Sequence, residues 1–173
     1  MGVTVKRVTL WRSETRNSPG MLARTLHPLA DSKQDLQLVI GYAYPDRQSA
    51  AIEVFPVEGN EAKSAARRAG LESCNFPCLV VTGDNRAGLS YQIANSLADA
   101  GVNLNFFIAQ KIGKQYTALF GFEAESEADL AVKIIRKVAA SAPRSAPEKA
   151  PTRAPARKSR PAARRSRPTA RVH

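Results

Sequence analysis

The sequence predicts an α+β protein of two similar units followed by a basic tail, and two observations carry this prediction. The first is an internal repeat: a shift of the chain by 68 positions places residues 29–31 on the identical residues 97–99, and Gly20 on Gly88. The second is a change of composition after residue 140, where large apolar side chains almost disappear. A repeat of this length indicates a duplicated structural unit.

The second copy begins with a strand and a helix. Residues 79–81 form a short apolar run that predicts a buried strand, and residues 83–85 are typical of a turn. Apolar residues at helical spacing over residues 89–97 then predict a helix that ends at Gly101.

Two strands and a second helix complete this copy. Residues 102–109 alternate as a strand does, which places Asn103 and Asn105 on one of its faces. A turn at Gly113 leads into a further strand over residues 116–122. The last amphipathic helix is marked by apolar residues at every fourth position, namely Leu130, Ile134 and Val138.

The first copy follows the same order, with two differences. Pro28 lies inside its first helix and should kink or shorten it, because proline cannot donate a hydrogen bond there. The loop before that helix is also expected to be longer by about two residues. The expected strands span residues 5–12, 36–43 and 50–57, and the helices start at Pro19 and span residues 61–69.

A strand-helix-strand-strand-helix unit closed by one more strand is the ferredoxin-like fold, in which two helices cover one face of a sheet. Residues 71–76 are the candidate closing strand of the first copy. The second copy has no such strand before the tail, so its sheet is either open or completed by another segment. The expected organisation is a first module over residues 1–72, a second over residues 73–140 and a disordered tail over residues 141–173.

The net charge of +11 belongs almost entirely to the tail. The first 140 residues carry 16 basic and 14 acidic side chains, whereas the last 33 carry 10 basic residues and one acidic residue. Such an arm can neutralise phosphates and bind nucleic acid without reading its sequence, or it can act as a solubilising segment. The candidate nucleic-acid contacts are Arg157, Lys158, Arg160, Arg164, Arg165 and Arg167.

The loop before each first helix offers more specific chemistry. Ser18 and Asn85 are N-cap candidates, Pro19 suits the first helical position, and the free amides of a helix start attract a carboxylate or phosphate. Asp84 could meet an ammonium group, and Gly88 would allow close approach of a ligand to the backbone. One small zwitterion carries both charges, although ordinary caps and turns explain the same residues.

Residues 16–30 and 84–110 resemble the signature of the ACT domain, in which a loop with Asp or Asn and a Pro-Gly pair leads into an apolar helix and then to an Asn-bearing strand. The second copy is the closer match and is similar to the regulatory part of aspartate kinases. The resemblance covers roughly residues 5–140 and not the tail. It departs from the family where Ala87 replaces the usual proline and where Arg16 and Asn17 replace an acidic residue.

The resemblance implies a module that binds amino acids between paired ACT domains through the backbone of the strand-to-helix loop. One copy could then serve only as a structural partner to the other. The implied ligand-binding residues are Asn17, Pro19, Gly20, Met21 and Leu22 in the first copy, and Asp84, Asn85, Ala87, Gly88, Leu89 and Asn103 in the second.

The sequence offers little for catalysis. It has no phosphate-binding glycine loop, no zinc-protease motif and no paired Cys motif, so we expect no enzyme, no metal and no cofactor. Cys74 and Cys78 read as free thiols, and His27 as a helix-surface residue. No stretch approaches the roughly 18 apolar residues of a membrane-spanning helix and no signal peptide is evident, which makes the cytoplasm the default location.

Two functions of different classes are compatible with these features. The preferred one is a non-catalytic protein that senses a small amino acid and forms a homodimer, because such sheets expose edges and ligand sites form where modules meet. The alternative is a nucleic-acid-associated protein in which the tail binds and the folded part dimerises.

Overall fold

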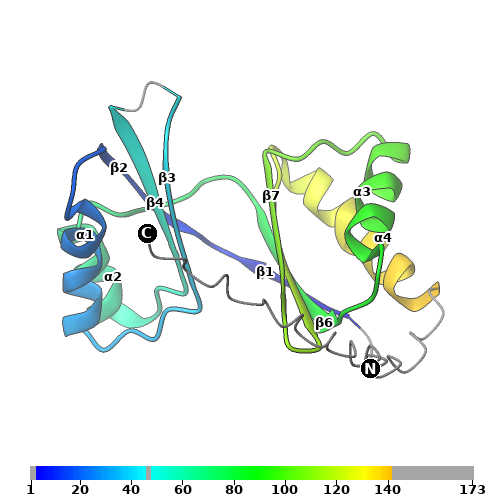
Figure 1. Cartoon of the computed structure of the whole chain (residues 1–173), viewed down its shortest axis with the longest axis horizontal. Helices are drawn as coiled ribbons and strands as arrows, with labels where there is room; N and C mark the ends of the chain where they lie inside the picture. The colour runs from blue at the N-terminus through cyan, green and yellow to red at the C-terminus, as the bar shows by residue number, and fades with distance from the viewer. Residues whose placement is uncertain (1–2, 46–47, 142–173) are drawn as a thin grey trace, which may run out of the picture.

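The computed structural model describes residues 3–45 and 48–141. In these residues two four-stranded antiparallel sheets each carry two helices on one face (Figure 1). The two helix pairs lie on opposite sides of the molecule, and the helix-free faces of the sheets meet between them (Figure 1). The structure confirms the α+β class and the two ferredoxin-like modules. Of the predicted tail, residues 141–173, Ser141 ends the last helix and residues 142–173 lie outside the described part.

The first module contains a sheet with the strand order β3-β4-β2-β5. Its closing strand is short and pairs with β2, with Ser73 opposite Trp11, so the closing strand expected within residues 71–76 is confirmed. The elements are β2 (Trp11–Arg16), α1 (Met21–Asp31), β3 (Leu38–Ala43), β4 (Ser49–Phe55), α2 (Gly59–Arg68) and β5 (Glu72–Ser73).

The second module contains the sheet β1-β6-β8-β7. The predicted apolar face of its first helix is confirmed, since Leu89, Ile93 and Leu97 are all buried against the sheet. Its elements are β6 (Cys78–Asp84), α3 (Leu89–Asp99), β7 (Phe106–Ile112), β8 (Gln115–Gly121) and α4 (Glu125–Ser141).

The strand that completes the second sheet comes from the start of the chain. The prediction of one strand over residues 5–12 is wrong: β1 (Thr4–Val8) and β2 are separate strands in different sheets. β1 runs antiparallel to β6, and Val5 opposite Val81 joins the core of the second module. The boundaries at residues 72 and 140 stay predictions, but the first residues of the chain contribute to the second sheet.

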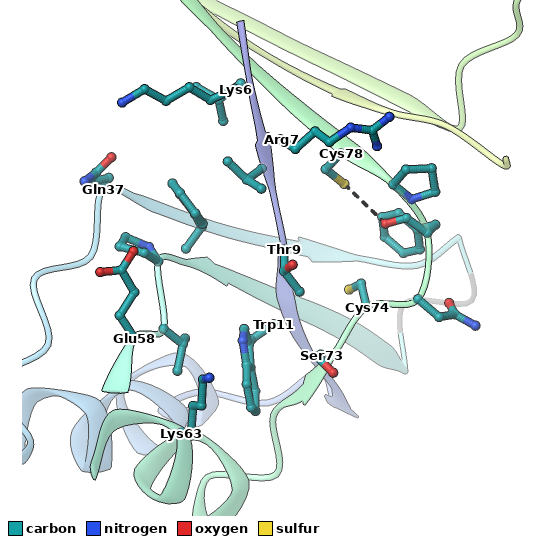
Figure 2. Close-up of a pocket in the computed structure, with 18 of the residues that line it drawn as sticks. Lys6, Arg7, Thr9, Trp11, Gln37, Glu58, Lys63, Ser73, Cys74 and Cys78 are labelled. Atoms are coloured by element: carbon teal, nitrogen blue, oxygen red, sulfur yellow. Dashed lines mark hydrogen bonds between the residues drawn. The ribbon is translucent and has the colours of Figure 1, made fainter. Parts of the chain in front are cut away.

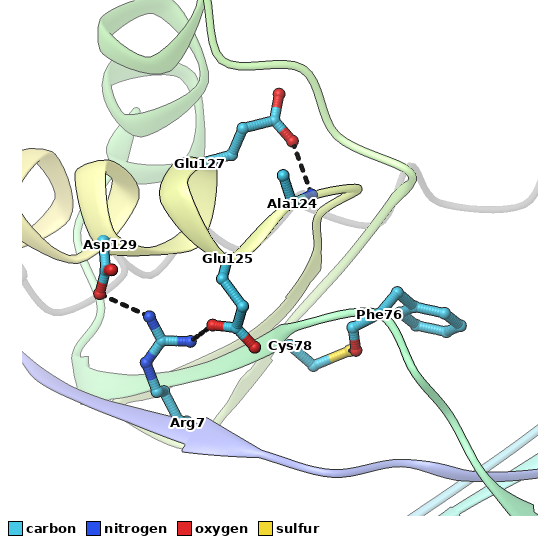
Figure 3. A network of polar contacts seen from close by, with 7 residues as sticks. All are labelled: Arg7, Phe76, Cys78, Ala124, Glu125, Glu127 and Asp129. Atoms are coloured by element: carbon cyan, nitrogen blue, oxygen red, sulfur yellow. Dashed lines mark hydrogen bonds and ion pairs between the residues drawn. The ribbon is translucent and has the colours of Figure 1, made fainter.

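Two ion pairs join β1 to the last helix of the second module. The guanidinium of Arg7 donates to Asp129 at 2.6 Å and pairs with Glu125, both on α4 (Figure 3). These hydrogen bonds, Asp129 first, raise the pKa of Arg7 against the opposing effect of desolvation. Because the three side chains are largely exposed, the pairs contribute mainly to the placement of β1 and little to stability.

A third apolar cluster joins the two modules across the helix-free faces of their sheets. Leu10, Cys78 and Leu119 are buried at its centre, and side chains of both sheets pack around them. Leu10 lies in the two-residue connection between β1 and β2, and its carbonyl accepts a hydrogen bond from Cys74 N at 2.8 Å. The modules are therefore held together in two ways near Leu10: β1 belongs to the sheet of the second module, and the apolar cluster packs between the two sheets.

Several local predictions need correction. Pro28 does not shorten α1, which has 11 residues like α3. The strand expected over residues 102–109 begins only at Phe106, so Asn103 and Asn105 precede it. In α4 the buried residues are Ala128, Ala131 and Ile135, whereas the predicted core residue Leu130 is 39% exposed.

The extra two residues of the first module lie in its strand hairpin and not before its helix. Both strand-to-helix loops have the same length, since Gly20 and Gly88 precede helices that start 68 positions apart. Across the hairpins, Leu38 pairs with Phe55 and Phe106 pairs with Gly121. Leu38 and Phe106 are also 68 positions apart, but their partners Phe55 and Gly121 are only 66 apart. The hairpin of the first module is therefore two residues longer.

Candidate functional site

The loop between β2 and α1 turns sharply before the helix begins. Gly20 is the N-cap residue, with φ of 85°, and Gly88 takes the same role before α3, with φ of 78°. Side chains with a Cβ rarely adopt this left-handed conformation, so glycine is required for the turn. The predicted N-caps Ser18 and Asn85 are therefore wrong: Ser18 starts the turn that precedes α1, and Asn85 lies one residue before the matching turn, which starts at Arg86.

The first turns of α1 and α3 carry no acidic residue, unlike those of the other two helices. α2 has Glu61 in its first turn, and α4 has Glu125 and Glu127. The Glu127 carboxylate accepts hydrogen bonds from the amides of Glu123 and Ala124, both at 3.2 Å (Figure 3). The first turns of α1 and α3 therefore have no negative side chain of their own to offset the positive end of the helix dipole.

A pocket of about 220 Å³ lies beside the loop of the first module. This volume is below the roughly 300–1,000 Å³ of pockets for drug-sized ligands, so the pocket suits a smaller molecule. Leu22 at its rim is 46% exposed. The lining residues come from β2 and the loop (Thr15, Arg16, Asn17, Ser18), from α1 (Met21, Leu22) and from β3 and β4 (Gly41, Tyr42, Ala43, Ala50, Ala51, Ile52).

A polar network lies on the opposite, helix-free face of the same sheet. Tyr42 donates a hydrogen bond to Glu53 Oε1 at 3.1 Å, and Arg12 Nε lies 3.7 Å from the same oxygen. Arg12 also pairs with Glu14 at 3.0 Å and contacts the hydroxyl of Tyr44. Burial, together with the negative charge of Glu53, raises the pKa of Tyr42 to about 12. Tyr42 is therefore a neutral phenol near neutral pH.

The corresponding loop of the second module is tied to neighbouring helices. Arg86 donates from Nη2 to Gln92 Oε1 at 3.0 Å and to the carbonyl of Val138 at 3.1 Å, near the end of α4. Leu89 is only 2% exposed and packs in the core, so its side chain is directed away from a ligand at the surface. Ser90, at the position of Leu22, donates to the hydroxyl of Tyr116 at 3.2 Å.

Comparison with known proteins finds similar structures but no similar sequence. The sequence matches no known protein family and no curated protein. Protein BT0572 from Bacteroides thetaiotaomicron matches with a TM-score of 0.64 at 10% identity, over 77% of this chain and 89% of that one. The regulatory subunit of aspartate kinase from Thermus thermophilus matches with a TM-score of 0.56 at 16% identity, over 80% of this chain and 97% of that one.

A third structure is a complete enzyme. The aspartate kinase of Clostridium acetobutylicum, described as an allosteric enzyme, matches with a TM-score of 0.53 at 15% identity, over 82% of this chain and 35% of that one. The chain shares its fold of two ferredoxin-like modules with the regulatory subunit of aspartate kinase. At these identities the likeness is one of fold, and it covers both modules.

The predicted ligand residues of the first module separate into two groups. Asn17, Met21 and Leu22 line the pocket, whereas Pro19 and Gly20 shape the turn above it. Gly41 and Tyr42 line the pocket as well and were not predicted. A glycine inside a strand is a signal of close approach, and it could have identified Gly41.

The predicted residues of the second module lie on one loop and one connection. Asp84 ends β6, Asn85, Ala87 and Gly88 form the loop, and Asn103 is exposed between α3 and β7. These assignments stay predictions, as do those of the tail, which lie outside the described residues.

Other candidate chemistry is placed as follows. Cys74 and Cys78 are free thiols, and His27 lies on the surface of α1 with Nδ1 2.9 Å from Asp31. Within residues 3–45 and 48–141, His, Cys, Asp and Glu form no cluster that could hold a metal ion. Over the same residues, no helix has the length and apolarity needed to span a membrane.

Proposed function

We propose that this protein is a non-catalytic regulatory protein that binds a free amino acid, and that the first ACT module provides the site. The observation that carries the proposal is the pocket at the start of α1, next to a helix end without an acidic residue. The fold supports a regulatory role, since structures of this fold include regulatory subunits of aspartate kinase.

The pocket has groups for both ends of a zwitterion. The amide of Met21 donates to the Ser18 carbonyl at 3.3 Å, so the next two amides of α1, those of Leu22 and Ala23, would receive an α-carboxylate, because the helix supplies no acceptors for them. β3 is an edge strand of its sheet, so carbonyl groups along its outer side can accept hydrogen bonds from an α-ammonium group. Apolar side chains of Met21 and Leu22 would contact a small side chain of the ligand.

We also propose that two copies associate through the exposed edge strands. β3 and β7 form the ends of their sheets, and both carry apolar side chains that water reaches. Exposed strand edges with apolar side chains are surfaces that proteins normally cover. The exposed apolar residues of these strands are Val39, Tyr42, Phe107, Ile108 and Ile112.

The nucleic-acid alternative rests on the composition of residues 142–173 alone. It predicts that removing these residues abolishes binding to DNA, and it is compatible with a sensor in the folded part.

The test is a thermal-shift screen of the full chain against the common amino acids. A ligand at 100 times its dissociation constant stabilises the folded state by about 2.7 kcal/mol. Gly41→Val should abolish the shift, because a side chain at residue 41 extends toward Leu22 into the pocket. Ala109→Val makes the matching change in the second module and should leave the shift intact.

Two results would contradict the proposal. One is the absence of a shift with every amino acid at millimolar concentration. The other is a shift that Ala109→Val removes and Gly41→Val does not, which would move the site to the second module.

A further inference from the structure

A groove of about 1040 Å³ lies between the two modules. Its walls come from β1, from the connection between β4 and α2, from α2 and from the segment that links the modules (Figure 2). Neither predicted ligand loop lines it. Its volume lies at the upper end of the range for small-molecule sites, so it can hold a ligand larger than a free amino acid.

Three cationic side chains line this groove without an anionic partner in the described part of the chain. Lys6 comes from β1, and Lys63 and Arg67 are one helical turn apart on α2. No carboxylate of the described residues lies within 4.0 Å of them, in contrast to Arg7, which is paired with Glu125. Figure 2 shows Lys6 and Lys63 at two ends of the groove, with Thr9 and Trp11 between them.

Two acidic side chains also line the groove: Glu125, which pairs with Arg7 at its edge, and Glu58, which is exposed. Glu58 is therefore the carboxylate left to face Lys6, Lys63 and Arg67. It lowers the local positive charge without cancelling it, because three cations remain against one carboxylate. Positive charge that the protein does not neutralise itself favours an anion in a concave site, where the field is concentrated.

The remaining wall is apolar and partly open to water. Phe55, Phe76 and Val80 are half-buried members of the cluster between the modules, and Pro77 and Val57 are buried beside them. Covering such surface stabilises a complex by roughly 25 cal/mol per Å². A ligand that fills the groove therefore needs an apolar body as well as a charge.

We propose that the groove between the modules binds a small organic anion, with its anionic group at Lys63 and Arg67 and its apolar body against Phe55 and Phe76. The segment 142–173 is a poor occupant because it carries 10 basic residues and one acidic residue. A metal ion is also disfavoured, since the His, Cys, Asp and Glu side chains of the described residues form no cluster that could hold one.

The molecule provides its own reporter for this site. Trp11 is the single tryptophan of the chain and lines the groove. The probes are anilinonaphthalene sulfonate, an aromatic anion whose fluorescence rises in apolar sites, and phenylnaphthylamine, which has the same ring system without the sulfonate. We expect the full-length protein to bind the sulfonate at least tenfold more tightly, with quenching of Trp11 emission.

Single-charge variants then locate the site. Arg67→Gln and Lys63→Gln should each weaken sulfonate binding about fivefold, because each removes a charge-assisted contact, and neither should change phenylnaphthylamine binding. Arg68→Gln is the matched control: Arg68 is the next residue on α2, does not line the groove and donates to Ser64 at 3.0 Å. The Arg68→Gln variant should bind the sulfonate with the same affinity as the unmodified protein. Unchanged unfolding midpoints show that the variants are folded.

Displacement of the bound sulfonate identifies the class of ligand. Adenosine monophosphate and citrate represent organic anions, and inorganic phosphate represents the bare charge. Displacement by an organic anion at concentrations where phosphate has no effect supports the proposal. Three results overturn it: equal binding of the two probes, equal loss of affinity in Arg67→Gln and Arg68→Gln, or equal displacement by phosphate and the organic anions.

Discussion

The two modules share one topology but complete their sheets differently. The first is closed by β5, a two-residue strand that follows it directly in the sequence. The second is closed by β1, a five-residue strand that precedes the first module. The difference shows that the sequence repeat does not divide the chain into two self-contained segments, since the second sheet includes the first residues of the chain.

The two strand-to-helix loops differ in a similar way. Both turn at a glycine with positive φ and both helices lack acidic residues in the first turn. The first loop borders a pocket, whereas Arg86 ties the second to Val138 at the end of α4. The first loop therefore has free space beside it. The second loop is attached by Arg86 to α4, the helix that precedes the tail.

The largest expected effect comes from breaking the exchange of β1. Val5 is 9% exposed and packs in the core of the second module. Val5→Asp would bury a carboxylate without a partner, and we expect it to destabilise the protein by about 3 kcal/mol or more. Urea unfolding should show the second module unfolding first by circular dichroism, while Trp11 fluorescence, which reports on the first module, changes later.

The neighbouring substitution Thr4→Asp is the control. Thr4 belongs to the same strand but is exposed, so its change should cost less than about 0.5 kcal/mol. Equal unfolding midpoints for the two variants would show that β1 does not support the second module.

The next effect concerns paired positions in the two hairpins. Phe106 lies opposite Gly121 in the second module, where the first has Leu38 opposite Phe55. A Cβ at residue 121 would overlap the ring of Phe106. We expect Gly121→Ala to destabilise by about 1–3 kcal/mol through overpacking, measured by urea unfolding.

A second glycine in an equivalent sheet supplies the comparison. A Cβ at Gly41 meets only Leu22 Cδ1, at 4.0 Å, and the second module already has Ala109 at the matching position. Gly41→Ala should therefore be close to neutral. Phe106→Leu should recover part of the loss in Gly121→Ala, and a failure to recover any of it would contradict overpacking as the cause.

The elements could be predicted from the sequence because their signals are local. The spacing of Leu89, Ile93 and Leu97 defines the buried face of α3 without information from the rest of the chain. The partner of a strand is not local. Residues 5–12 read as one strand because both halves suit an extended conformation, and only the packing of Leu10 between the modules separates them.

The candidate site could also be predicted only where its signals are local. The turn glycines gave the position of both loops, but not which loop opens onto a pocket. That difference depends on Arg86 and Val138, which are 52 positions apart in the sequence. The groove depends on α2, β1 and the linking segment, which no short motif connects.

The smallest expected effect is the pH dependence of stability that comes from Tyr42. Tyr42 belongs to a charged network that the second module lacks. Arg12 lies opposite Glu53, where the second module has Val80 opposite Leu119, and Tyr42 corresponds to Gln110. Because burial raises the pKa of Tyr42 from 10.0 to about 12, the folded state holds this proton more tightly than the unfolded state. The stabilisation is complete below pH 10 and is lost as the pH rises to about 12.

Since Tyr42 is 40% exposed, solvent screening limits the effect to less than about 1 kcal/mol. Other tyrosines and both thiols titrate in the same range, so the informative quantity is the difference between the native protein and Tyr42→Phe. That difference in unfolding free energy should shrink between pH 10 and pH 12, and tyrosinate absorbance should appear at higher pH in the native protein than in urea. A difference that stays constant with pH would mean that Glu53 does not hold the Tyr42 proton, and that the two sheet faces differ in charge without a consequence for stability.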